Sequence, residues 1–167
     1  MKEDLVKELG LRALGTRLKR IADAMSHSSR AMYKKLDLDI EPNWYLILKL
    51  VNERKAISVI DIADSIGFTH QSVITITNKM IKKGYLKSAK DANDLRRTVF
   101  TLTPKAIDTL PAVEQIWDCG EEVITEMLHH QTEILKYLDT IEQQFNQSSF
   151  GDRIIHKLKS EQDGEAS

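Results

Sequence analysis

The spacing of apolar residues predicts a chain that is mainly helical. In the first segment, apolar or small residues recur every three or four positions along one side of a helix, namely Leu11, Leu14, Leu18, Ile21, Met25, Ser28 and Met32. A chain of 167 residues has little core with which to cover so long a seam. We therefore expect this helix, within residues 1–36, to pack partly against a second subunit. The alternative is an ordinary core helix.

Two short helices with a tight turn between them are predicted in the middle of the chain. Ser58 is followed three residues later by an acid, which is close to the capping-box pattern of a helix start. Gly67 suits the left-handed conformation that ends a helix. Thr69 is a capping residue for the next helix, which runs from His70 to about Lys83. A helix, a three-residue turn and a second helix are typical of a helix-turn-helix.

A pair of strands follows the second helix, at residues 85–90 and 98–102. In the second of them Thr98, Phe100 and Leu102 alternate with residues of the opposite face. The loop between the strands holds no Asn-Gly or Asp-Gly turn and is long and charged. This order predicts a mainly α protein with a small β-hairpin, a winged helix-turn-helix. Such a fold places one helix in the major groove of DNA and a charged loop, the wing, beside it.

The rest of the chain is predicted to be helical. Thr103 is a capping residue and Pro104 suits the first turn of a helix. Helical spacing then continues to about Phe145, with a break near residues 129–131. A short amphipathic end, residues 152–159, is either helical or disordered. The chain thus divides into an N-terminal helix (1–36), a winged helix-turn-helix lobe (37–103), C-terminal helices (104–160) and a disordered tail (161–167).

Positive charge is concentrated in the predicted helix-turn-helix and hairpin. From Lys79 to Lys105 there are eight basic residues and two acids, a net charge of +6. The whole chain has a net charge of −1, so the remaining residues sum to −7. A basic face on a nearly neutral protein favours a role in nucleic-acid binding.

Side chains of the second helix and of the wing are candidate DNA contacts. Gln71 can pair bidentately with adenine, and Ile74 or the Thr75 methyl can contact a thymine methyl. Arg96 suits a narrow minor groove, where Asp94 can hold it by a bidentate ion pair. The candidates are Thr69, His70, Gln71, Ser72, Ile74, Thr75, Asn78 and Lys79 in the helix, and Asp94, Arg96 and Arg97 in the wing. Each has the alternative of being an ordinary solvated surface residue.

The same residues carry a family likeness. The loop over residues 91–97 has the pattern Asp-x-x-Asp-x-Arg and leads into a strand that ends in Leu102-Thr103. This loop is similar to the wing of the MarR family of bacterial transcriptional regulators. The capped start at 58–63, the turn at 67–69 and the helix-to-strand glycine at 84 match in order and spacing. The likeness extends from about Leu9 to Ile141, with two departures: Ala106 and Thr75 stand where the family commonly has Gly and Arg.

The resemblance implies a homodimer, held by its N- and C-terminal helices, on a pseudo-palindromic site in double-stranded DNA. It also implies a repressor that a small aromatic effector releases from DNA. Residues that would line an effector pocket between the dimer helices and the DNA-binding lobe are Met25, His27, Trp44, Tyr45 and Trp117. The alternative for these five is that they belong to the core or the surface.

Other classes of function find less support in the sequence. Motifs of phosphate-binding loops, zinc proteases and serine hydrolases are missing, so we expect neither an enzyme nor a cofactor. Adjacent His129 and His130 would point apart on a helix, so no metal site is expected. Two alternatives stay open, a redox-sensing regulator that uses Cys119 and a winged-helix module that binds a protein instead of DNA.

The sequence also indicates where the protein acts. The single cysteine, Cys119, favours a reducing compartment. No apolar run approaches the roughly 20 residues of a membrane span, and the N-terminus lacks the apolar core of a signal peptide. We therefore expect a cytoplasmic protein without membrane contact.

Overall fold

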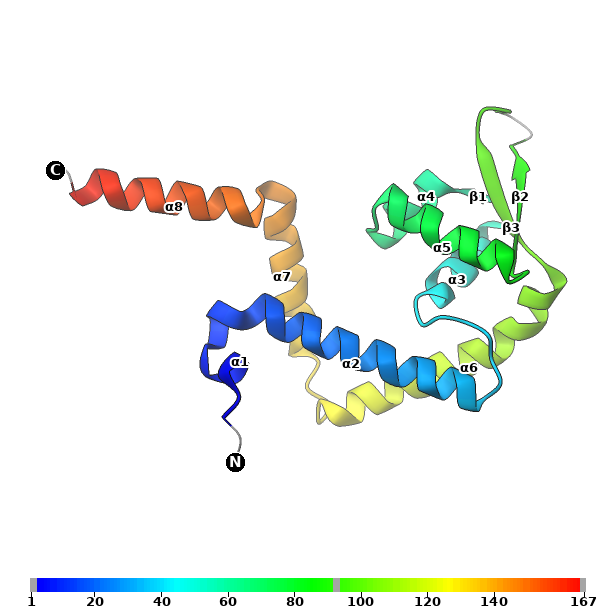
Figure 1. Cartoon of the computed structure of the whole chain (residues 1–167), viewed down its shortest axis with the longest axis horizontal. Helices are drawn as coiled ribbons and strands as arrows, with labels where there is room; N and C mark the ends of the chain where they lie inside the picture. The colour runs from blue at the N-terminus through cyan, green and yellow to red at the C-terminus, as the bar shows by residue number, and fades with distance from the viewer. Residues whose placement is uncertain (1–2, 92–93, 166–167) are drawn as a thin grey trace. The chain divides into compact units, whose positions relative to one another are not determined.

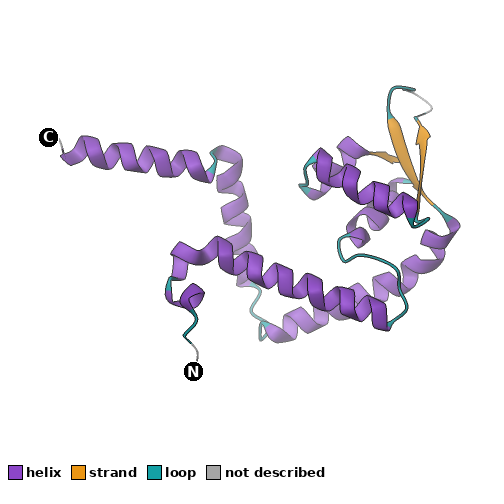
Figure 2. Ribbon diagram, in the orientation of Figure 1, coloured by secondary structure: helices purple, strands orange, loops and turns teal. Residues whose placement is uncertain are grey.

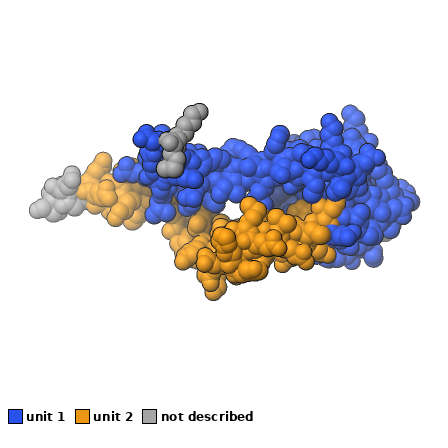
Figure 3. Space-filling view, turned by 90° about the horizontal axis from the view of Figure 1, so that it is seen from below, with its two compact units in different colours: residues 1–115 blue, residues 116–167 orange. Residues whose placement is uncertain are grey.

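The computed structural model describes residues 3–91 and 94–165, which fold as helices and one small sheet (Figure 2). The chain forms two compact units, residues 1–115 and 116–167 (Figure 3). This division concerns compactness alone. The functional segments drawn from the sequence, with boundaries after residues 36 and 103, stay predictions.

The N-terminal segment is not one helix. A short helix, α1 (Leu5–Glu8), and a 3-10 turn, η1 (Gly10–Ala13), precede the long α2 (Leu14–Lys35) (Figure 1). Gly10 explains the interruption, because its φ of +54° lies in the left-handed region that a helix cannot use. On α2 the apolar seam remains open, with Ile21 50% and Met25 49% exposed.

The helix-turn-helix has the predicted order and bounds. Helix α3 (Trp44–Arg54) precedes α4 (Val59–Ile66). After a three-residue turn, α5 (His70–Lys82) follows. Gly67 ends α4 in the left-handed conformation, with a φ of +68°. The side chain of Ser58 accepts a hydrogen bond from the Asp61 amide at the start of α4. The capping signals in the sequence therefore located both helices correctly.

A three-stranded antiparallel sheet, in the order β1-β3-β2, supports the wing. Strands β2 (Leu86–Lys90) and β3 (Thr98–Leu102) form the predicted hairpin. Strand β1 (Ile57–Ser58) pairs with β3 in the register Ile57 to Phe100 and Ser58 to Val99. This strand was not predicted, since two residues are too few to show the alternation of a strand. It joins the start of α4 to the base of the wing.

The core of the winged lobe lies between α3, α5 and the sheet. Trp44 is 3% exposed, and its ring meets that of Tyr85 edge to face with centroids 5.5 Å apart. The inner face of α5 is buried, at Val73, Ile76, Thr77 and Met80. Burial of this face turns the opposite side of α5 toward solvent.

Two contacts from the start of α6 (Pro104–Met127) hold the C-terminal end of α5. The Thr103 hydroxyl donates to the Gly84 carbonyl at 2.6 Å, and the Lys105 ammonium donates to the Lys83 carbonyl at 2.9 Å. The same ammonium lies 4.2 Å from the centre of the Tyr85 ring, a cation–π contact. Thr103 also accepts from the Ala106 amide at 3.2 Å, as the predicted cap of α6.

The second unit contains the C-terminal half of α6, together with α7 (Glu133–Gln147) and α8 (Phe150–Glu165). The predicted break near residues 129–131 is confirmed, and both His129 and His130 have positive φ there. The prediction of a disordered tail from 161 is wrong for the described part, because α8 continues to Glu165. Good helix formers such as Glu161 and Gln162 extend the helix, while residues 166–167 lie outside the described part.

No helix among the described residues is long and apolar enough to cross a lipid bilayer.

Candidate nucleic-acid interface

The outer face of α5 presents every helix residue that the sequence nominated. Thr69 caps the helix, because its hydroxyl oxygen accepts from the Ser72 amide at 3.2 Å. The other backbone amides of the first turn lie at the positive end of the helix dipole. This end of α5 therefore favours a phosphate. Eight side chains are exposed on this face: Thr69, His70, Gln71, Ser72, Ile74, Thr75, Asn78 and Lys79. The structure therefore brings them together at the surface.

A shallow concavity of about 570 Å³ lies against the first turns of α5. The turn before α5 lines it with Gly67 and Phe68, and Asn43 also contributes. Polar side chains of the helix, among them Gln71 and Thr75, line it as well. This open surface is lined by polar and apolar groups in similar measure and suits contact with a larger partner.

The wing holds Arg96 in the predicted bidentate ion pair. Its Nε lies 3.1 Å from Oδ1 of Asp94 and its Nη2 lies 3.3 Å from Oδ2. The Arg96 amide also donates to Asp94 Oδ1 at 3.1 Å. Hydrogen bonds from the Arg96 side chain and backbone hold the pKa of Asp94 below its ordinary value of 3.8. Because the Arg96 side chain is 92% exposed, the guanidinium is aimed outward without being buried.

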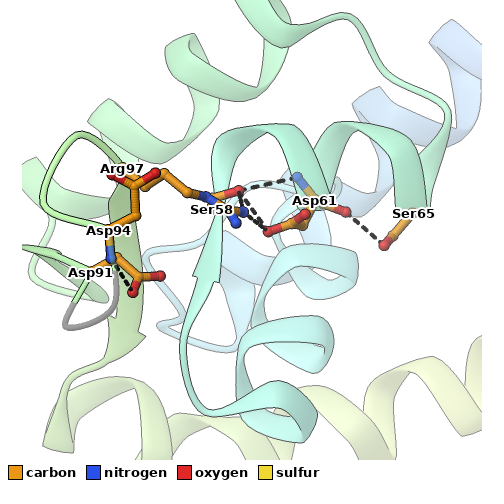
Figure 4. A network of polar contacts seen from close by, with 6 residues as sticks. All are labelled: Ser58, Asp61, Ser65, Asp91, Asp94 and Arg97. Atoms are coloured by element: carbon orange, nitrogen blue, oxygen red, sulfur yellow. Dashed lines mark hydrogen bonds and ion pairs between the residues drawn. The ribbon is translucent and has the colours of Figure 1, made fainter.

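Arg97, also nominated as a DNA contact, points elsewhere. Its Nη2 lies 2.6 Å from Asp61 Oδ2 and 3.0 Å from the Ser58 hydroxyl, at the start of α4 (Figure 4). A hydrogen bond from Ser58 and the positive charge of Arg97 lower the pKa of Asp61 from 3.8. The two neighbouring arginines thus have different partners, one within the wing and the other on a helix 36 residues away in sequence.

The basic residues around α5 divide into two groups. Lys83 pairs with Asp39 at 2.7 Å, and its hydrogen bond lowers the pKa of that carboxyl. Lys105 is engaged at the end of α5, as described above. By contrast, four exposed lysines make no ion pair with any residue that the structure describes: Lys79, Lys82, Lys87 and Lys90. These four have their charge available for phosphates.

The residues nominated for an effector pocket belong to three helices, α2, α3 and α6. Trp44 belongs to the core against Tyr85, which is its alternative role from the sequence. Met25 and His27 are exposed on α2, and Tyr45 is half-buried on α3. Trp117 lies in the second unit. Within one chain Trp44 is therefore a packing residue, and the pocket as a whole stays a prediction.

Cys119 is exposed on α6, among acids of the same helix. The redox hypothesis gains no support from this arrangement and stays a prediction.

Comparison with known proteins gives the same picture as the geometry. Residues 38–97 match the model of the MarR family. The HTH-type transcriptional regulator Hpr of Bacillus pumilus is 31% identical over 104 residues, covering 56% of this chain and 50% of Hpr. The chain thus spans half the length of this curated relative.

Two solved structures show a similar fold. The MepR–DNA complex of S. aureus has a TM-score of 0.65 at 18% identity, covering 80% of this chain and 96% of that chain. A mutant MarR of E. coli complexed with operator DNA has a TM-score of 0.63 at 15% identity, with coverages of 85% and 98%. Both similarities extend well beyond the matched 60-residue core of 38–97. Over its winged helix-turn-helix, residues 38–97, the chain is similar to the MarR family.

Proposed function

We propose that this protein is a sequence-specific, double-stranded DNA-binding transcriptional regulator without enzymatic activity. The observation that carries the proposal is the exposed polar face of α5 beside a wing whose Arg96 is held outward by Asp94. The relatives add support, since Hpr is described as a transcriptional regulator and the MepR and MarR structures contain DNA.

In the proposed mode of binding, α5 enters the major groove. Gln71 pairs with an adenine edge, while Ile74 and the Thr75 methyl meet thymine methyl groups. Arg96 enters the adjacent minor groove, where negative potential is enhanced. The four lysines without ion pairs contact phosphates, which supplies affinity independent of sequence.

We propose that the protein acts as a symmetric homodimer on a pseudo-palindromic operator. The open seam of α2, with Ile21 and Met25 half exposed, offers apolar surface for a second copy. A dimer also places two copies of α5 in successive major grooves about 34 Å apart. One chain has a mass of 19.1 kDa. Sedimentation at micromolar concentration is expected to give twice that mass. A stable monomer at that concentration would contradict this assembly.

The proposed biological role is repression in the bacterial cytoplasm, relieved by a small aromatic effector. Repression follows from occupancy of an operator. Effector release is inferred from the family alone, with Met25, His27, Tyr45 and Trp117 as the residues to test first.

A binding titration against salt tests the proposed function. Duplexes selected by the purified protein from a random-sequence library are bound at several salt concentrations. If the dimer contacts six to ten phosphates, affinity is expected to fall about 10³- to 10⁵-fold between 50 and 200 mM salt. Failure to retain any duplex at low salt would refute DNA binding and favour a winged-helix module that docks an acidic protein.

A further inference from the structure

An ionic contact joins the base of the wing to the first turn of α4. The Arg97 guanidinium bridges the Asp61 carboxylate at 2.6 Å and the Ser58 hydroxyl at 3.0 Å. Ser58 in turn donates to the same oxygen of Asp61 at 2.6 Å. These three side chains form a closed triangle that links segments 36 to 39 residues apart in sequence (Figure 4).

The backbone of Arg97 also secures the wing loop. Its amide donates to the Asp94 carbonyl at 2.9 Å, and its carbonyl accepts from the Asp91 amide at 3.0 Å. Arg97 therefore closes the loop with its backbone and joins that loop to α4 with its side chain. Arg96, the wing's outward guanidinium, is its immediate neighbour.

We propose that Arg97 is a positioning residue, whose ion pair with Asp61 fixes where the wing presents Arg96 to DNA. This inference rests on the proposed DNA-binding function. The side chains of Arg97 and Asp61 are 44% and 42% exposed, so their contact contributes little to global stability. Its effect is on orientation. Pairing with β1 already fixes β3, the strand that follows Arg97. The wing loop before Arg97 has no other ion pair to α4 among the described residues.

The sign of one substitution separates this role from a direct contact. Removal of an acid beside a DNA-binding surface removes repulsion and strengthens binding. If Asp61 instead orients the wing through Arg97, its removal weakens binding. We therefore compare Asp61→Asn with Asp64→Asn, which loses the same charge from an exposed residue of the same helix. The expected result is about a threefold to tenfold loss for Asp61→Asn and equal or tighter binding for Asp64→Asn, a coupling typical of contacting pairs.

The arginine side of the contact gives a second, independent readout. Arg97→Met keeps the aliphatic stem and is expected to weaken binding as much as Asp61→Asn does, without changing the slope of log affinity against log salt. A lost phosphate contact would reduce that slope by about one per site. Because both single variants break the same ion pair, the double variant is expected to bind no worse than either alone.

The outcomes distinguish this inference from the function on which it rests. Absence of duplex binding by the unchanged protein refutes both. Binding by the unchanged protein, with tighter binding of Asp61→Asn, additive losses in the double variant or a reduced salt slope for Arg97→Met, refutes the positioning role alone. Thermal unfolding of each variant is measured in parallel. A variant that fails to fold is replaced by Arg97→Lys, which keeps the positive charge but lacks the planar guanidinium that bridges Asp61 and Ser58.

Discussion

Arg96→Ala is expected to lower operator affinity about 30-fold or more in a symmetric dimer. The estimate takes roughly 1–3 kcal/mol for each specific arginine contact, made twice. The side chain is 92% exposed and, among the residues that the structure describes, forms an ion pair only with Asp94 in its own loop. Its removal should therefore leave the unfolding free energy within about 1 kcal/mol of the original. Fluorescence anisotropy on the selected duplex measures the loss, and chemical denaturation measures stability.

A matched control separates the minor-groove contact from a general loss of charge. Arg12→Ala removes an exposed arginine from η1, outside the helix-turn-helix, and should change affinity by less than about twofold at physiological salt, where charges more than roughly 8 Å away are screened. Equal effects of the two substitutions, or an unchanged affinity for Arg96→Ala, would remove the wing from the proposed interface.

Trp44→Ala is expected to destabilise the winged lobe by about 3–5 kcal/mol. Trp44 is 3% exposed and packs edge to face on Tyr85, so truncation leaves a cavity and removes an aromatic contact. Since domains are typically stable by only about 5–15 kcal/mol, the variant should unfold at much lower urea concentration.

The conservative variant Trp44→Phe tests whether packing is the cause. It retains a ring against Tyr85 and should lose clearly less stability than alanine. A loss below about 1 kcal/mol for Trp44→Ala would mean that the side chain is not part of the core, and would return Trp44 to the set of candidate effector residues.

Local signals explain why the sequence predicted the helix-turn-helix and the wing well. Ser58, Gly67 and Thr69 each mark a helix end through their own hydroxyl or backbone freedom, and the structure shows these ends where they were expected. The same holds for Asp94 and Arg96, whose ion pair spans two residues. Contacts of this range leave a pattern in the sequence.

Longer-range contacts leave no such pattern. The sequence indicated no partner for Arg97, and only the fold brings Asp61 to it. Strand β1 has two residues and is defined by its partner β3, so hydrophobic alternation did not reveal it. The interruption at Gly10 depends on a positive φ, which the sequence permitted without requiring.

Both ends of α5 are tied down before any DNA is present. Thr69 caps the first turn of α5. At the other end, Thr103 and Lys105 donate hydrogen bonds to the backbone carbonyls just after its last turn. A helix secured in this way loses little conformational entropy on entering a groove, because its order is already established when the protein folds. Recognition by this helix should therefore resemble rigid docking, with backbone amides along α5 that exchange slowly in the free protein and change little when DNA is added.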